Sequence, residues 1–301
     1  MADFIISVPL DTKLAEFIGK KGSVNSVTFY NRKIDNDTIV ALTPSSIEEK
    51  FYALATSLLI ADQIVISTAS VDKYLGEALV AASLLNKHVI ITNDNDISNL
   101  MSSIRIQDTE VVDKAMLLER ITKHSKKDTS QLPLVVDIDK AFPVKGVGTV
   151  LLGIVRTGTI KVHDKMHHPN GKEVLIRSIQ SQDVDVQTAG RGTRVGLAIK
   201  GVEYEEFDKG DVLSEKAVKR VQKLAGSVSV SAISNEEIRE GARYGIAINM
   251  SYVEGTIEEA SEGSLKIRLE KQVCAEIGDE FLLVRPRSPR IFASGKVTSV
   301  S

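Results

Sequence analysis

The stretch Phe142-Pro-Val-Lys-Gly-Val-Gly-Thr-Val-Leu-Leu-Gly-Ile-Val-Arg-Thr-Gly158 decides how the middle of this 301-residue chain folds. It predicts a turn between Gly146 and Gly148 with a positive backbone φ, because glycine adopts that region without steric cost. A strand follows the turn, and Gly153 stands in it where a side chain would obstruct a neighbouring strand. Gly158 then ends the strand and closes a hairpin. The stretch therefore predicts antiparallel β-structure.

Short strands of the same kind, separated by glycines, continue toward the C-terminus. In the middle third we expect strands at 134–138, 148–154, 159–162, 174–179, 194–199 and 211–213. In the last third we expect them at 224–231, 243–250, 252–258, 264–269 and 280–285. Regularly spaced short strands with turn signals favour closed antiparallel barrels, so the sequence predicts two of them.

The first third of the chain alternates between strand and helix patterns. Strands are expected at 4–8, 63–67 and 88–92, a hairpin at 27–30 and 38–42, and helices at 12–18, 46–60, 73–85 and 110–124. This alternation predicts a mostly parallel sheet covered by helices. The polar segment 124–131, followed by Pro133, is the best linker. We therefore divide the chain into domains at 1–130, 131–217 and 218–301.

Four segments of the middle third resemble the second domain of translational GTPases of the elongation factor Tu family. They are 142–158, Ile160-Lys-Val-His-Asp-Lys165, Gly190-Arg-Gly-Thr-Arg-Val-Gly-Leu-Ala-Ile-Lys-Gly201 and Asp208-Lys-Gly-Asp-Val-Leu-Ser214. The segments 265–283 and 288–300 resemble the third domain of the selenocysteine-specific elongation factor and of the initiation factor 2 gamma subunit, a subtype that suggests an archaeal origin. The resemblance implies a degenerate, P-loop-like α/β G domain followed by two antiparallel β-barrels of the elongation factor Tu type.

In that family the first domain binds GTP through a glycine-rich loop that ends in Gly-Lys-Ser/Thr, whose backbone N–H groups hold the phosphates. After its first strand this chain reads Ser7-Val-Pro-Leu-Asp-Thr-Lys-Leu-Ala15, without a glycine, and Pro9 lacks an N–H group. Thr12 and Lys13 are remnants in reversed order. The downstream Gly19-Lys-Lys-Gly-Ser23 follows a helix rather than a strand, so we interpret it as a helix end with solvated lysines.

The other two nucleotide-binding elements are also degenerate. The element that holds Mg²⁺ and positions water reads Leu42-Thr-Pro-Ser-Ser46, in which only Pro44 remains. The guanine-reading element reads Asn93-Asp-Asn-Asp96, which keeps Asn93 and Asp96 but lacks the lysine. We therefore predict a pseudo-GTPase without catalytic residues, cofactor or metal. GTP and Mg²⁺ enter only under the alternative of weak GTP binding with residual hydrolysis.

The resemblance implies that the rim of the second domain holds the aminoacylated end of a tRNA. The residues carried over to this pocket are Phe142, Val144, Lys145, Gly146, Val147 and Gly148, with Arg191 and Arg194 near its edge. Lys140 replaces an acidic residue of the family, which puts the same ligand in doubt but suits an RNA end. The alternative is that these residues only form the barrel.

A second candidate RNA contact is Arg285-Pro-Arg-Ser-Pro-Arg290, which combines a rigid backbone with three planar guanidinium groups suited to phosphate. The candidate residues are Arg285, Arg287 and Arg290, and the alternative is a solvated hairpin loop. The histidines at 163, 167 and 168 lie near a strand turn and are better explained as loop residues than as a metal site.

Composition narrows the remaining classes of function. A net charge of −2 argues against a broad DNA binder, no apolar run reaches membrane-spanning length, and the N-terminus has no signal-peptide pattern. The single cysteine, Cys274, excludes an internal disulfide and fits the cytoplasm. We therefore expect a translation factor homologue whose partner is a tRNA or the ribosome. A second alternative is a scaffold that pairs with a true GTPase, or with itself, through the degenerate domain.

Overall fold

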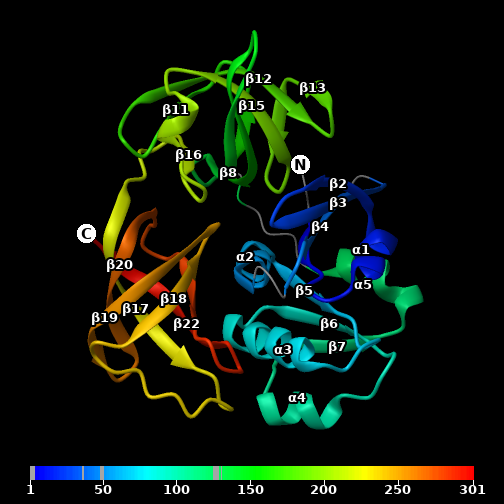
Figure 1. The fold of residues 1–301 in the computed structure, drawn as a ribbon. Coiled ribbons are helices and arrows are strands. Elements are labelled where there is room, and N and C mark those ends of the chain that lie inside the picture. The colour runs from blue at the N-terminus through cyan, green and yellow to red at the C-terminus, as the bar shows by residue number, and fades with distance from the viewer. Residues whose placement is uncertain (1–3, 36, 48–50, 125–128, 130) are drawn as a thin grey trace.

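The computed structural model describes residues 4–35, 37–47, 51–124, 129 and 131–301. It consists of three parts that meet at a common centre, an α/β first domain and two β-barrels (Figure 1). This confirms the predicted fold class. The strands of the three parts lie within residues 4–112, 135–214 and 220–300, and we call these parts the first domain, the middle barrel and the C-terminal barrel.

The first domain is built on a seven-stranded sheet with the order β2-β3-β4-β1-β5-β6-β7. Its strands are β1 (Phe4–Ser7), β2 (Lys20–Val24), β3 (Val27–Ile34), β4 (Asp37–Pro44), β5 (Gln63–Ile66), β6 (His88–Thr92) and β7 (Thr109–Val112). The neighbouring strands β4, β1, β5, β6 and β7 are parallel to one another, whereas β3 pairs antiparallel with both β2 and β4. The predicted hairpin and the mostly parallel sheet are therefore confirmed.

Among the described residues, five α-helices cover the two faces of this sheet (Figure 1). They are α1 (Thr12–Ile18), α2 (Phe51–Ile60), α3 (Lys73–Leu85), α4 (Ser98–Ile104) and α5 (Leu117–Lys123). One core cluster joins α1 and α5 to one face, and another joins α2, α3 and α4 to the other. None of the described helices is long and apolar enough to cross a membrane.

The sequence interpretation was wrong for the segment 110–124, which is not one helix. Its first residues form β7, then a 3-10 turn spans Lys114–Met116, and only Leu117–Lys123 is α-helical. The β-branched pair Val111 and Val112 extends the sheet beside β6, and Asp113 accepts a hydrogen bond from the amide of Ala115 at 3.0 Å, which starts the turn. Tertiary pairing along the sheet edge therefore overrides the helical period.

Besides β7, two further elements of the first domain were not expected from the sequence, β2 and α4. The predicted helix 46–60 is described from Phe51, and residues 48–50 lie outside the described residues. Most of the predicted linker, residues 125–128 and 130, lies outside them as well.

The middle barrel closes through the order β11-β16-β8-β9-β15-β12, with β12 returning to β11 and β13 attached to β12. Its strands are β8 (Val135–Val144), β9 (Gly148–Thr157), β10 (Thr159–Lys161), β11 (Lys165–His167), β12 (Glu173–Ser181), β13 (Val184–Val186), β14 (Thr188–Gly190), β15 (Arg194–Lys200) and β16 (Val212–Ser214). The expected positive φ is found at Gly146 (80°) and Gly148 (99°). A Cβ on Gly153 would lie 2.4 Å from the carbonyl oxygen of Asp137, which confirms the predicted close approach.

The C-terminal barrel is closed by the order β17-β20-β19-β18-β21-β22. Its strands are β17 (Arg220–Val230), β18 (Arg243–Ile248), β19 (Ser251–Ser261), β20 (Ser264–Cys274), β21 (Glu280–Val284) and β22 (Ile291–Val300). The surface of this barrel that packs against the middle barrel contains Cys274, which is buried beside Val135, Val212 and Val218. Burial first, and then the charge of Asp211, raise the pKa of the Cys274 thiol to about 12, so this cysteine is an inert core residue.

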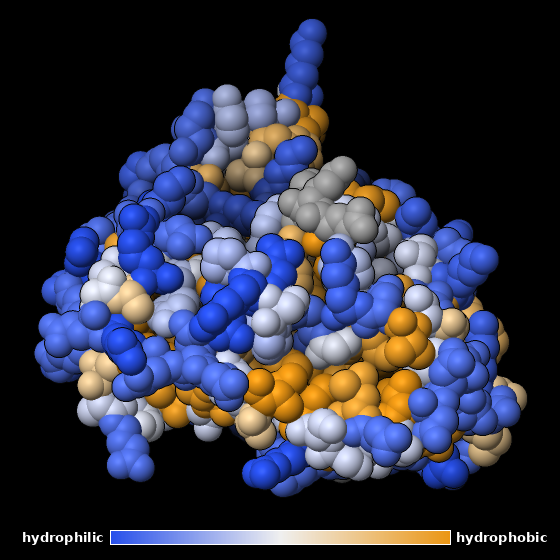
Figure 2. Space-filling model, turned by 60° about the horizontal axis from the view of Figure 1, so that its bottom comes forward, coloured by the Kyte–Doolittle hydropathy of each residue, from blue (hydrophilic) through white to orange (hydrophobic). Residues whose placement is uncertain are grey.

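All three parts share apolar contacts. One cluster contains Phe29 and Leu42 of the first domain, Ile154 of the middle barrel and Met250 of the C-terminal barrel. The underside of the molecule, where α4 lies, carries an apolar area bordered by hydrophilic side chains (Figure 2). Helix α4 supplies Leu100 and Met101, which are only partly buried.

Candidate functional site

The carboxyl end of β1 is where the sequence interpretation places the remnant of a phosphate loop. Helix α1 begins there, and Asp11 is its N-terminal cap. The Asp11 carboxylate accepts a hydrogen bond from the Leu14 amide at 2.9 Å and another from the Ser67 hydroxyl at 2.8 Å. Thr12 and Lys13 are exposed. A negative charge of the protein itself therefore lies at the helix end that would otherwise favour an anion.

The neighbouring strand ends form a polar network of their own. The Thr68 amide donates to the Thr92 hydroxyl at 2.9 Å, and the Asn95 side-chain amide donates to the Thr68 carbonyl at 2.7 Å. Asp96 accepts from the Ser98 amide at 2.9 Å, and this hydrogen bond lowers the pKa of Asp96 below its ordinary value. Asn93 and Asp96 therefore belong to a polar turn that precedes α4.

The end of β4 contains the third remnant, Pro44. Leu42 is fully buried in the core, and Pro44 is paired with Val27 of β3. No carboxylate is present at this edge from Leu42 to Ser46, and the described residues contain no cluster of three metal-ligating side chains. The residues at these strand ends therefore do not fit GTP with Mg²⁺.

A cleft of about 380 Å³ separates the β2–β3 hairpin from the middle barrel. The first domain contributes Lys20, Lys21 and Asn31, and the middle barrel contributes a set of polar and apolar residues, Leu152, Gln180, Gln182, Asp183, Arg194, Val195 and Gly196. Lys20 and Lys21 are exposed on β2. The cleft combines cationic and amide side chains, a combination that suits phosphate groups and base edges.

These lysines are the functional candidates that the sequence interpretation missed. The segment from Gly19 was assigned to a helix end, and α1 does end there. However, Gly19 is extended (φ −156°), and the chain continues at once as the edge strand β2. The signal was a Lys-Lys pair beside a predicted β-hairpin, but only the position of the middle barrel shows that the pair faces a cleft.

Arg191 and Arg194 are buried, with relative exposures of 6% and 8%. Arg191 donates to both carboxylate oxygens of Asp62 in the first domain, at 2.6 and 2.7 Å. Arg194 donates to Asp139 at 2.7 Å and lies 4.7 Å from the ring centre of Phe29. The two arginines predicted at the edge of an RNA pocket thus join the middle barrel to the first domain.

The predicted pocket residues Phe142, Val144, Lys145, Gly146, Val147 and Gly148 lie together at the tip of the β8–β9 hairpin. Val147 is 37% exposed, and its carbonyl accepts a hydrogen bond from Arg177. The Lys140 ammonium lies 5.6 Å from the centre of the Phe142 ring. The tip is therefore an exposed surface that carries three cations, Lys140, Lys145 and Arg177.

The arginines of the 285–290 loop have three different environments. Arg285 is buried and donates to Glu236 at 2.5 Å, and Arg290 lies 3.8 Å from the centre of the Phe51 ring in the first domain. Arg287 is exposed and also donates to Glu236. Two of these guanidinium groups are thus engaged inside the protein, which reduces the RNA-contact prediction for this loop to Arg287.

Besides the cleft beside Lys20 and Lys21, a basic groove follows the junction of the two barrels. Two adjoining hollows, of about 580 and 320 Å³, share Arg220 and Gln272. Exposed Lys219 and Lys271 line them together with Tyr252, whose ring centre lies 5.9 Å from that of Tyr52 on α2. Aromatic and cationic side chains beside a groove are the groups on which nucleic acid bases and phosphates bind.

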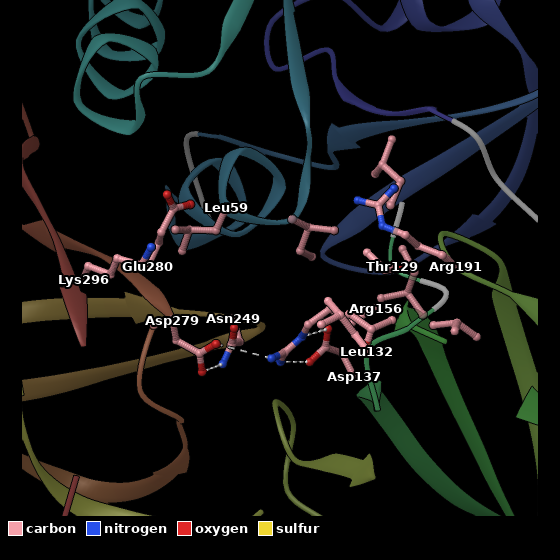
Figure 3. Close-up of a pocket in the computed structure, with 16 residues that line it drawn as sticks. Leu59, Thr129, Leu132, Asp137, Arg156, Arg191, Asn249, Asp279, Glu280 and Lys296 are labelled. Atoms are coloured by element: carbon pink, nitrogen blue, oxygen red, sulfur yellow. Dashed lines mark hydrogen bonds and ion pairs between the residues drawn. The ribbon is translucent and has the colours of Figure 1, made fainter. Parts of the chain in front are cut away.

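A cavity of about 270 Å³ lies where all three parts meet (Figure 3). Arg156 spans it, donating to Asp137 and approaching Asp279 at 3.6 Å, and Asn249 donates to Asp279 at 2.9 Å. Burial alone would lower the pKa of Arg156, but the two carboxylates outweigh burial and raise that pKa above its ordinary value. Arg156 is therefore held in its charged form between the two carboxylates.

Comparison with known proteins identifies relatives of this chain. Residues 148–214 match the family model of elongation factor Tu domain 2. An uncharacterized protein of Methanocaldococcus jannaschii is 28% identical, with 93% of this chain and 94% of that protein covered. The selenocysteine-specific elongation factor of the same organism is 27% identical over 74% of this chain, which spans only 59% of that relative's length.

Solved structures agree with the fold. Translation elongation factor SelB from Methanococcus maripaludis, in complex with the GTP analogue GPPNHP, superposes with a TM-score of 0.81 at 19% identity, covering 100% of this chain and 80% of that one. A bacterial selenocysteine-specific elongation factor gives 0.78 at 18% identity, covering 99% and 58%. The matched barrel, the similar relatives and the shared three-part fold lead to one conclusion: this chain contains an elongation factor Tu domain 2 barrel and is similar in sequence and fold to selenocysteine-specific elongation factors.

Proposed function

We propose that this protein is a pseudo-GTPase that acts in protein synthesis by binding a tRNA or the ribosome without a nucleotide switch. The observation that carries the proposal is the position of Asp11 at the start of α1. Its carboxylate accepts hydrogen bonds from the Leu14 amide and from the Ser67 hydroxyl. A phosphate at this position would meet that negative charge at close range, which is strongly unfavourable.

Two features support RNA as the partner. The cleft beside Lys20 and Lys21 and the groove between the barrels are both lined by cations, although the net charge of the chain is −2. The relatives named as elongation factors make the translation machinery the natural source of that RNA.

Isothermal titration of the protein with GTP, GDP and aminoacyl-tRNA in the presence of Mg²⁺ tests the proposal. We expect no heat of binding from either nucleotide at micromolar concentrations and a saturable heat from aminoacyl-tRNA. Micromolar binding of GTP would refute the pseudo-GTPase assignment. Absence of binding to both aminoacyl-tRNA and isolated ribosomes would refute the RNA assignment.

The cleft itself is tested by reversing its charge. In the double variant Lys20→Glu, Lys21→Glu, we expect RNA affinity to fall roughly tenfold and the salt dependence of binding to become shallower, because two phosphate contacts are lost. The matched control is Lys13→Glu, Lys33→Glu, which changes the net charge equally at exposed positions outside the cleft. Equal loss of affinity in both variants would show that the effect is one of net charge and not of the cleft.

A further inference from the structure

The 285–291 segment of the C-terminal barrel is docked on helix α3. Glu77, in the middle of α3, is 3% exposed, and its carboxylate faces this segment. It accepts hydrogen bonds from the Ser288 hydroxyl at 2.8 Å, from the Arg290 amide at 2.9 and 2.7 Å, and from the Ile291 amide at 3.3 Å. A buried carboxylate with this many donors is a strong and geometrically specific contact.

The same segment also holds the start of helix α2. The Arg290 guanidinium lies 3.8 Å from the ring centre of Phe51, the first described residue of α2. The base of the segment is fixed by Glu236, which accepts from Arg285 and Arg287 and also from the Tyr244 hydroxyl. The loop is therefore fixed by its hydrogen bonds to Glu236, and its Arg290 packs on helix α2.

The other end of α2 is held by the middle barrel. Helix α2 ends at Ile60, and Asp62, two residues later, receives both hydrogen bonds of Arg191. Both ends of the helix thus contact arginines from different barrels. Between them, α2 and α3 share an apolar cluster with Ala247, Leu282, Val284 and Ile291 of the C-terminal barrel.

We propose that the two barrels form a built-in clamp on α2, so that the first domain keeps one position against both barrels with or without nucleotide. Helix α2 follows the segment Leu42–Ser46, which corresponds to the element that holds Mg²⁺ and positions water in the family that this chain resembles. In this protein the position of α2 is fixed by Arg290 and Arg191. The cleft beside Lys20 and Lys21 therefore keeps one width. This inference rests on the proposed function only for what enters that cleft.

Hydrogen–deuterium exchange of the full chain tests the clamp. Glu77→Gln replaces an acceptor oxygen by an NH₂ group that faces amide donors, so we expect exchange in peptides covering 51–60 and 285–291 to accelerate at least tenfold. Peptides of β1 and β5 should not change. The control Glu259→Gln removes an exposed contact with Lys266 within the C-terminal barrel and should leave all of these peptides unchanged.

A second variant tests the same contact in case Glu77→Gln does not fold. Arg290→Met keeps the backbone amide that donates to Glu77 but removes the guanidinium from Phe51, so only the 51–60 peptides should accelerate. Unchanged exchange at 51–60 in both variants would overturn the clamp. So would a wild-type protein whose 51–60 exchange changes when GTP or GDP is added. RNA titration of the same samples reports separately on the proposed function, because an intact clamp with no RNA binding refutes only that function.

Discussion

Replacing Asp137 with alanine is expected to destabilise the protein by about 3–5 kcal/mol, because it removes the main counter-charge of Arg156. Asp137 is 2% exposed, and the Arg156 side chain, at 25% exposure, reaches across the central cavity to it. Asp279, the second carboxylate, lies 3.6 Å away and cannot replace the two hydrogen bonds that Asp137 accepts. The variant would thus leave a charge mostly buried with one distant partner.

Urea unfolding followed by circular dichroism measures this effect. The matched control is Asp185→Ala, which removes an exposed aspartate of the same barrel that accepts a hydrogen bond from Gln180 and should change the free energy of unfolding by less than about 0.5 kcal/mol. A loss below about 1 kcal/mol would show that Arg156 does not depend on Asp137.

Replacing Gly153 with alanine is expected to destabilise the middle barrel by about 2–3 kcal/mol or more. The added Cβ would lie 2.4 Å from the carbonyl oxygen of Asp137 and 3.1 Å from a methyl group of Val136. The obstruction is backbone, which cannot rotate away as a flexible side chain could. β8 and β9 would have to separate, and Asp137 would move with them.

The same unfolding measurement applies to this variant, with Gly196→Ala as the control. Gly196 lies on the neighbouring strand β15, and a Cβ there would meet only side-chain atoms at 3.6 and 3.8 Å, which is ordinary contact. We expect the control to remain within about 1 kcal/mol of the wild type. Equal stability of Gly153→Ala and the control would contradict the close approach of β8 and β9.

The fold was largely predictable because its signals are local. Glycines at 146, 148 and 153 mark a turn and a close approach, and the structure has a positive φ at the first two and an obstructed Cβ at the third. Where the prediction was wrong, a tertiary contact opposed the local pattern. The segment 110–124 has a helical period, but its first residues complete the edge of the sheet beside β6.

The candidate site was predictable only in part. The absence of a glycine after β1 and the loss of a carboxylate at Leu42 can be read from the sequence, since both concern residue identity. That Asp11 caps α1 and accepts from Ser67 depends on two segments 56 positions apart. That Lys20 and Lys21 face a cleft depends on a barrel that begins more than a hundred residues later.

The sequence by itself determined the family resemblance, the three-part architecture and the loss of the nucleotide motifs, because residue type and spacing encode turns, strands and phosphate loops directly. Only the tertiary structure decided what the arginines do. Arg191, Arg194, Arg285 and Arg290 all have the chemistry of an RNA contact, yet each is engaged inside the protein with a carboxylate or an aromatic ring. A guanidinium binds a carboxylate as readily as a phosphate, so its partner is set by which groups the fold brings within about 3 Å of it.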